Sequence, residues 1–150
     1  MLFRSPLPVE RMDCAYRKAG RRFPDRAPGL IEEVRAGVAT MAAERGIAAE
    51  RLVLGGRSMG GRMCSMAVAE GLAAAGLVLV CYPLHPPDRP DNLRVGHFPR
   101  LEVPCLFVSG DRDRFGSPEE FAEHLPAIPG PVTTVCLPGK GHDLDRKSVV

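Results

Sequence analysis

The chain has 150 residues, of which 45% are hydrophobic and 25% are charged. This composition is typical of one globular domain with its own core, and it argues against disorder. The formal net charge of +2 is too small to indicate a nucleic-acid partner. The longest nearly apolar run, residues 71–84, is shorter than the roughly 20 residues that a membrane span needs, so we expect no membrane association.

The cysteines predict a reduced protein. They are odd in number, form no C-x-x-C pair and lie partly inside apolar runs: Cys14, Cys64, Cys81, Cys105 and Cys136. Such thiols are typical of a core rather than of a disulfide framework. The N-terminal sequence MLFRSPLPVER lacks the apolar segment of a secretory signal, and the histidines show no metal-ligand spacing. We therefore expect a cytoplasmic protein without a metal site.

The first half of the chain alternates helix and strand patterns. Apolar residues recur at three- and four-residue steps over residues 28–45 and Gly46 follows, which predicts an amphipathic helix ended by a glycine. Residues 52–54 predict a short buried strand that runs into a glycine-rich segment. Residues 59–70, rich in Met and Ala and followed by Gly71, predict a second helix.

The second half continues this alternation. LVLVCY at 77–82 and CLFV at 105–108 are continuous apolar runs of strand length, and VTTVCL at 132–137 closes the series. Ser117, followed by proline and, three residues on, by glutamate, predicts a capped helix start. Strands that are apolar on both faces and alternate with helices predict a single α/β domain over 1–150, with a mostly parallel sheet flanked by helices on both sides.

One serine lies among the glycines that follow the first predicted strand. GRSMG at 56–60 fits the pattern G-x-S-x-G of a nucleophile elbow and stands between a predicted strand and a predicted helix, as that motif requires. The serine of such an elbow is strained, and we expect side chains at the two glycine positions to collide with the neighbouring strand and helix. Two other interpretations stay open. The glycines could form only a tight connection with Ser58 as an incidental cap, or they could cradle a phosphate, although the Walker pattern needs a lysine after its last glycine and here Arg62 stands two positions past Gly60.

A serine nucleophile of this kind needs an acid and a histidine later in the chain, each at the end of a strand. Asp113 follows the predicted strand CLFV, and His142 follows the predicted strand VTTVCL. Ser58 Oγ would then attack an acyl carbonyl, His142 would act as general base, and Asp113 would stabilise the imidazolium. Asp111 is the competing acid, with a turn-forming role as its alternative. A loop-capping role is the alternative for His142.

The other histidines have simpler interpretations. His124 lies on the last predicted helix and is expected in solvent, while His85 and His97 fall in or near the Pro-rich segment 82–92. A loop of this length can border a substrate pocket. We therefore expect three side chains to line the pocket: Leu84, His85 and Phe115.

Four basic residues gather near the N-terminus: Arg17, Lys18, Arg21 and Arg22. The first interpretation is a solvated loop, and the alternative is an anion-attracting rim near the substrate entrance. Neither predicts sequence-specific nucleic-acid binding.

With these motifs the chain resembles the α/β-hydrolase superfamily, in particular the dienelactone-hydrolase-related branch that includes a testis-expressed protein and a subunit of the NSL chromatin complex. The resemblance covers most of the chain and is carried by YRKAGRRFPDRAP (16–28), RLVLGGRSMGGRM (51–63), GLVLVCYPLHPP (76–87), RLEVPCLFVSGDRDRFGSPEE (100–120) and LPGKGHDL (137–144). It implies a nucleophile at Ser58, an acid at Asp113 and a catalytic His142. It also implies hydrolysis of a small-molecule ester or related acyl substrate without metal or organic cofactor.

The chain also departs from the family pattern. Family members open with further strands and a glycine-rich loop that supplies one of two oxyanion donors, and this sequence has no such loop. The N–H of Met59 is the one donor that we expect. Family members also continue into a helix after the histidine, whereas this sequence stops at DLDRKSVV. We therefore expect a domain clipped at both ends, and we keep a catalytically weak or inactive interaction module as the alternative function.

The missing strands also bear on association. Without its usual neighbour, the segment RLVLGG would form a sheet edge with unpaired backbone donors and acceptors. Such an edge pairs readily with another chain. We therefore expect either self-association along this edge or marginal solubility.

Overall fold

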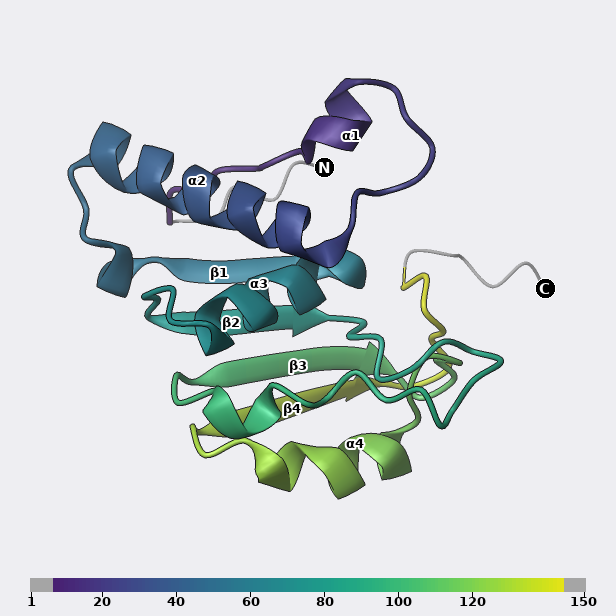
Figure 1. Cartoon of the computed structure of the whole chain (residues 1–150). Coiled ribbons are helices and arrows are strands. Elements are labelled where there is room, and N and C mark those ends of the chain that lie inside the picture. Colours follow the sequence, from purple (N-terminus) through teal and green to yellow (C-terminus); the bar gives the residue numbers. More distant parts are fainter. Residues whose placement is uncertain (1–6, 145–150) are drawn as a thin grey trace.

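The computed structural model describes residues 7–144. One parallel sheet has the strand order β1-β2-β3-β4, with β1 at Val53–Arg57, β2 at Gly76–Val80, β3 at Cys105–Gly110 and β4 at Val132–Leu137. The helices are α1 (Ala15–Lys18), α2 (Ala27–Arg45), α3 (Met59–Ala69) and α4 (Pro118–His124) (Figure 1). Single turns of 3-10 helix lie at η1 (Ala49–Arg51), η2 (Phe98–Arg100) and η3 (Leu125–Ala127). The predicted α/β class with a parallel sheet is confirmed.

The local sequence signals explain where the elements start and stop. α2 ends at Gly46, whose φ of 62° is a left-handed conformation that glycine adopts without strain. α4 opens with a capping box, because the Ser117 hydroxyl accepts the Glu120 N–H and the Glu120 carboxylate accepts the Ser117 N–H. β1 extends to Arg57, beyond the predicted strand, because its glycines still pair with β2.

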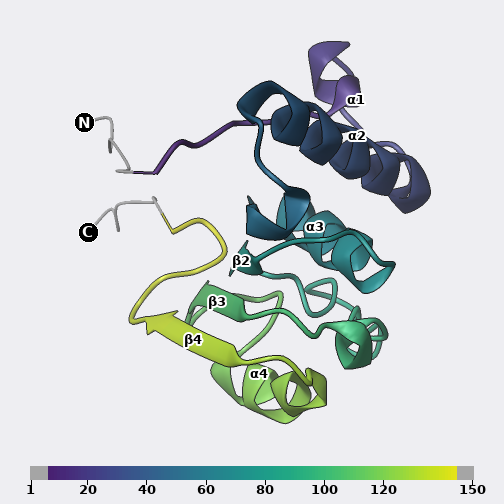
Figure 2. The same cartoon turned by 90° about the vertical axis from the view of Figure 1, so that its left-hand side faces the viewer.

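Helices cover one face of this sheet. Leu79 of β2 lies against Gly61 of α3, and the ring of Phe107 on β3 is centred 5.9 Å from the ring of Phe121 on α4. Leu79 and Phe107 are paired neighbours in adjacent strands, so they point to the same face. In Figure 2 the helices accordingly stand on one side of the strands.

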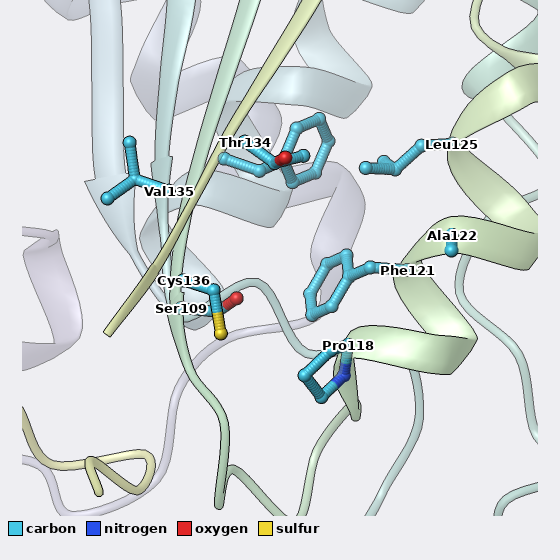
Figure 3. A pocket seen from close by; sticks show the side chains of 9 residues that line it. Ser109, Pro118, Phe121, Ala122, Leu125, Thr134, Val135 and Cys136 are labelled. Carbon is cyan, nitrogen blue, oxygen red and sulfur yellow. The ribbon is translucent and has the colours of Figure 1, made fainter. Parts of the chain in front are cut away.

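The opposite face of the sheet carries apolar side chains with no helix over them in the described residues. Val53 is 60% exposed and Val135 is 42% exposed, while Val78 and Val80 between the edges are half-buried. Figure 3 shows Val135 on the other side of β4 from Phe121. For residues 7–144 the prediction of helices on both sides is therefore wrong. The apolar runs in the strands combine one buried row of side chains with one half-buried row.

Several sequence expectations concern burial and the chain ends. All five cysteines are free thiols, and three of them are buried: Cys64, Cys81 and Cys105. No helix among residues 7–144 has both the length and the hydropathy that a bilayer crossing requires. The expected clipping after His142 concerns residues 145–150, which lie outside the described range, as do residues 1–6.

His97 is a buried core residue rather than a site residue. Its Nε2 lies 2.8 Å from Ser65 Oγ, which donates its own proton to the carbonyl oxygen of Arg62. His97 Nε2 must therefore carry the proton that Ser65 accepts. Burial, followed by the nearby charges of Arg62 and Arg100, lowers the pKa of His97 to about 4.

This depressed pKa predicts a pH dependence of stability. Between the ordinary pKa of 6.5 and the folded value of about 4, the unfolded chain binds a proton that the folded chain does not. The free energy of unfolding should therefore fall as the pH drops through this window. His97→Gln keeps a donor for Ser65 and does not titrate, so urea denaturation at several pH values should give a flatter dependence. Equal slopes for His97→Gln and the unmodified protein would contradict the assignment.

β1 forms one edge of the sheet, since among residues 7–144 it pairs only with β2. Self-association along this edge stays a prediction. Val53→Lys should weaken it, because a charged side chain on an edge strand opposes strand pairing. Phe23→Lys is the matched control, since Phe23 is 74% exposed and lies outside the sheet. Sedimentation velocity over a concentration series measures the effect, and a monomeric unmodified protein at every concentration would contradict the prediction.

Candidate active site

Ser58 stands at the turn between β1 and α3. Its φ of 50° and ψ of −119° define a backbone conformation that residues other than glycine rarely adopt. The Ser58 N–H donates to the carbonyl of Val80 at 2.8 Å, and the Ser58 carbonyl accepts the N–H of Arg62 at 3.1 Å. These bonds continue the sheet on one side and open the helix on the other. The strained residue is thus held between two regular elements.

The glycines around Ser58 allow β1 and α3 to approach closely. A Cβ on Gly56 would lie 2.5 Å from backbone atoms of Gly60 and Gly61, and a Cβ on Gly61 would lie 2.6 Å from the Gly56 carbonyl oxygen. A Cβ on Gly60 would meet nothing within 4 Å. The predicted collision at the second glycine of G-x-S-x-G is therefore wrong. The backbone contact occurs one residue later, because Gly61 is the helical position that faces β1.

The His142 ring lies between Ser58 and Asp113, within hydrogen-bonding distance of both. His142 Nε2 is 2.8 Å from Ser58 Oγ, and His142 Nδ1 is 2.9 Å and 3.1 Å from the two carboxylate oxygens of Asp113. The Asp113 side chain is 1% exposed and the His142 side chain is 25% exposed. Asp113 also accepts the N–H of Phe115 at 2.9 Å. The Asp113 carboxylate is therefore buried, and its hydrogen bonds hold it facing the imidazole ring.

Asp111, the competing acid, takes a different role. Its carboxylate accepts the N–H of Gly139 at 2.8 Å, which ties the turn after β3 to the turn after β4. This is the turn-forming role that was its sequence-based alternative. Asp113 is thus the carboxylate that pairs with His142.

The segment that carries His142 crosses the end of β3 to reach Ser58. The Arg112 N–H donates to the carbonyl of Lys140 at 2.9 Å, and a Cβ on Gly110 would collide with that same carbonyl. Gly110 therefore lets the chain pass directly over the strand end. This crossing is needed because β1 and β4 are the two outer strands of the sheet.

Two further contacts hold His142, and sequence analysis missed both roles. The Phe115 ring stacks on the imidazole, with centroids 4.1 Å apart and an interplanar angle of 29°. The Arg57 guanidinium donates to the His142 carbonyl at 2.9 Å and to the Asp143 carboxylate at 3.3 Å. Arg57 is a variable position of the G-x-S-x-G pattern, so no local signal pointed to it.

Two of the three expected pocket-lining residues are buried, and the third borders the site. Leu84 is 0% exposed and His85 is 4% exposed. The His85 ring nitrogens lie 2.8 Å from the Pro86 carbonyl and 2.9 Å from a Glu120 carboxylate oxygen. Leu84 and His85 therefore pack inside the fold and do not present a surface to a substrate. Phe115 is half-buried and borders the site through its stack on the imidazole.

A small cavity of about 130 Å³ lies between α4 and the strands β3 and β4 (Figure 3). Its walls are mostly apolar, with Phe121 from α4 and Leu125 from η3 facing Thr134 and Cys136 from β4. None of the residues expected at the substrate pocket lines this cavity. It is thus separate from the Ser58 site.

Two of the N-terminal basic residues make local contacts, and one of these contacts is an ion pair. Arg21 makes two hydrogen bonds to Asp25, at 2.8 and 2.9 Å, and the Arg22 guanidinium lies 5.7 Å from the centre of the Phe23 ring. The connection from α1 to α2, which contains Arg21 and Arg22, lies toward the carboxyl ends of the strands (Figure 1). An anion-attracting rim stays a prediction that rests mainly on Arg17 and Lys18.

Comparison with known proteins identifies the family. The profile of the family described as "Alpha/beta hydrolase domain" matches residues 7–149. The chain therefore belongs to the α/β-hydrolase family.

Solved structures share the fold at low sequence identity. An alpha-beta serine hydrolase homologue from Coxiella burnetii is 21% identical with a TM-score of 0.63, and the match covers 81% of this chain and 54% of that one. A Thermus thermophilus protein is 21% identical with a TM-score of 0.63, over 79% of this chain and 57% of that one. Puromycin hydrolase is 22% identical with a TM-score of 0.60, over 75% of this chain and 22% of that one. The chain thus spans between about a fifth and just over half of these proteins.

The elbow geometry predicts opposite effects of two adjacent substitutions. Gly61→Ala should destabilise the fold by about 1–3 kcal/mol, the usual cost of overpacking, because the new methyl group meets the Gly56 carbonyl. Gly60→Ala should be neutral or stabilising by up to about 1 kcal/mol, because it adds a better helix former in open space. Urea denaturation of both variants tests the pair. A larger loss for Gly60→Ala would contradict the observed packing.

Proposed function

We propose that this protein is a serine hydrolase that cleaves an ester or a related acyl compound through Ser58, His142 and Asp113. The observation that carries the proposal is the continuous series of short contacts from Ser58 Oγ through both imidazole nitrogens to the Asp113 carboxylate. Such a series is what a serine needs in order to lose its proton during attack. The α/β-hydrolase family of the chain supports the same proposal.

In the proposed reaction, Ser58 Oγ attacks the acyl carbon while His142 Nε2 takes the hydroxyl proton. His142 then gives this proton to the leaving group, and an acyl-serine remains. A water molecule attacks the acyl-serine with His142 again as base, which releases the acid and restores Ser58. Asp113 stays ionised and accepts the hydrogen bond from Nδ1–H throughout, and its burial strengthens its attraction to the imidazolium.

The proposed oxyanion stabilisation rests on the N-terminus of α3. Met59 is the first residue of this helix, so its N–H has no partner within the helix and lies at the positive end of the helix dipole. We propose this N–H as one donor to the developing negative charge. Loss of one donor from a pair typically costs 10²- to 10³-fold in rate. A site with Met59 alone would therefore be a slow hydrolase.

Further parts of the proposal concern context. We propose that the chain lies in the dienelactone-hydrolase-related branch of its family, on the strength of the motif YPLHPP at residues 82–87. We propose a small-molecule acyl substrate, no nucleic-acid partner and a cytoplasmic setting in which the five thiols remain reduced. Side chains, the Met59 backbone N–H and water supply the proposed chemistry, so it requires no metal or organic cofactor.

A second candidate function is an interaction module that keeps the fold without useful catalysis. One observation favours it: one apolar face of the sheet is partly exposed at Val53 and Val135. Exposed apolar patches of this kind are typical of protein interaction surfaces.

Labelling with a fluorophosphonate probe separates the two functions. We expect modification of Ser58 in the unmodified protein, none in Ser58→Ala, and a strong reduction in His142→Ala. Asp113→Asn should slow labelling by roughly 10⁴-fold, the effect of losing the corresponding carboxylate in a serine protease. Mass spectrometry of the labelled peptide and the labelling rate are the measurements.

Asp111→Asn is the matched control for the acid. Asparagine keeps an oxygen that can accept the Gly139 N–H, so the turn is preserved and the labelling rate should stay within a few-fold. Equal slowing by Asp111→Asn and Asp113→Asn would contradict the assignment of the acid. A folded protein that is not labelled at all would favour the interaction module.

A further inference from the structure

Cys81 lies against the candidate catalytic residues, and the proposed hydrolysis does not use it. It follows directly after β2 and is 0% exposed. Its Sγ, one ring nitrogen of His142 and one carboxylate oxygen of Asp113 all lie within 4.8 Å of one another. A thiol, an imidazole and a carboxylate thus lie close together, although the sequence spacing predicted no metal site.

We propose that Cys81, Asp113 and His142 form a Zn²⁺ site that overlaps the candidate catalytic residues, so that Zn²⁺ reversibly switches the site off. The binding part is independent of the proposed hydrolase function, and the inhibition part rests on it. Zinc binds all three groups, at about 2.3 Å to sulfur and about 2.0–2.2 Å to nitrogen and oxygen. Ligands at these distances are about 3.5 Å apart around a tetrahedral ion, so small side-chain shifts close the site.

The mixture of ligand atoms selects the metal. Mg²⁺ and Ca²⁺ prefer oxygen ligands, whereas a set with sulfur, nitrogen and oxygen suits Zn²⁺. The Cys81 thiol releases its proton to solvent as the Zn–S bond forms, so the exchange is balanced without any redox step. Three protein ligands leave a fourth position for water, as in many zinc sites of enzymes.

Metal binding and proton transfer exclude each other at His142. Its Nδ1 faces the Asp113 carboxylate and its Nε2 faces Ser58 Oγ. A zinc ion on either nitrogen therefore replaces one of the two hydrogen bonds on which the proposed base depends. The His142 side chain is 25% exposed, so one of the three proposed ligands contacts solvent, while Asp113 and Cys81 are buried.

The first test measures zinc binding to the full chain by competition with a chromogenic chelator. Cys81→Ser should weaken Zn²⁺ binding by at least about tenfold, a loss that outer-shell changes alone produce in zinc sites. Co²⁺ as a spectroscopic probe should give a thiolate-to-cobalt absorption band that Cys81→Ser abolishes. Cys136→Ser is the matched control, because Cys136 is exposed and lies outside the cluster, and it should keep both signals.

The second test measures Ser58 labelling by the fluorophosphonate probe with and without Zn²⁺. Zinc should slow labelling of the unmodified protein, and EDTA should restore the rate. In Cys81→Ser the ratio of the two rates should approach one. A protein that binds zinc through Cys81 but is never labelled would contradict the hydrolase proposal and leave the metal site standing.

Unchanged zinc binding in folded Cys81→Ser, or loss of binding in Cys136→Ser, would overturn the proposal. Circular dichroism reports whether Cys81→Ser folds. Should it not fold, Asp113→Asn and His142→Ala keep the thiol and remove the other two ligands in turn. Each of these two variants should weaken zinc binding by about as much as is expected for Cys81→Ser. Zinc binding as tight as in the unmodified protein in both variants would contradict the proposed site.

Discussion

The close backbone contact between Gly56 in β1 and Gly61 in α3 is the constraint on which the candidate site depends. Side chains at either position would overlap the opposite backbone. Because the two elements approach so closely, the chain must turn from strand to helix at Ser58, which adopts a strained conformation. Buried residues of α3, among them Met63 and Ala67, hold the helix against the sheet and so maintain that strain.

The sheet order imposes a second constraint on the site. Ser58 follows one outer strand and His142 follows the other, so the second segment must cross the strand ends between them. Gly110 makes room for this crossing, and Arg57 fixes its end through the His142 carbonyl. The same crossing places Asp113 against the imidazole and near Cys81, so the proposed catalytic residues and the proposed zinc site share one arrangement.

The fold class and the ends of most elements followed from local sequence patterns. A glycine C-cap at Gly46, a capping box at Ser117 and apolar runs of strand length are short-range signals, and each element appeared within a few residues of its predicted range. The order of serine, acid and histidine along the chain likewise named three residues that lie together. The prediction that helices cover both faces of the sheet was wrong. An apolar run in a strand places side chains on both faces of the sheet, but it does not show how deeply each face is buried.

By itself the sequence determined which residues form strands and helices. It also determined that a serine, acidic residues and a histidine follow three of those strands. Only the tertiary structure decided which of them meet. It paired His142 with Asp113 rather than Asp111, brought Arg57 to the His142 carbonyl, and buried His85. The physical reason is separation along the chain: the first two contacts join residues 29 and 85 positions apart. Partners at such distances are selected by strand order and close packing, which no local pattern encodes.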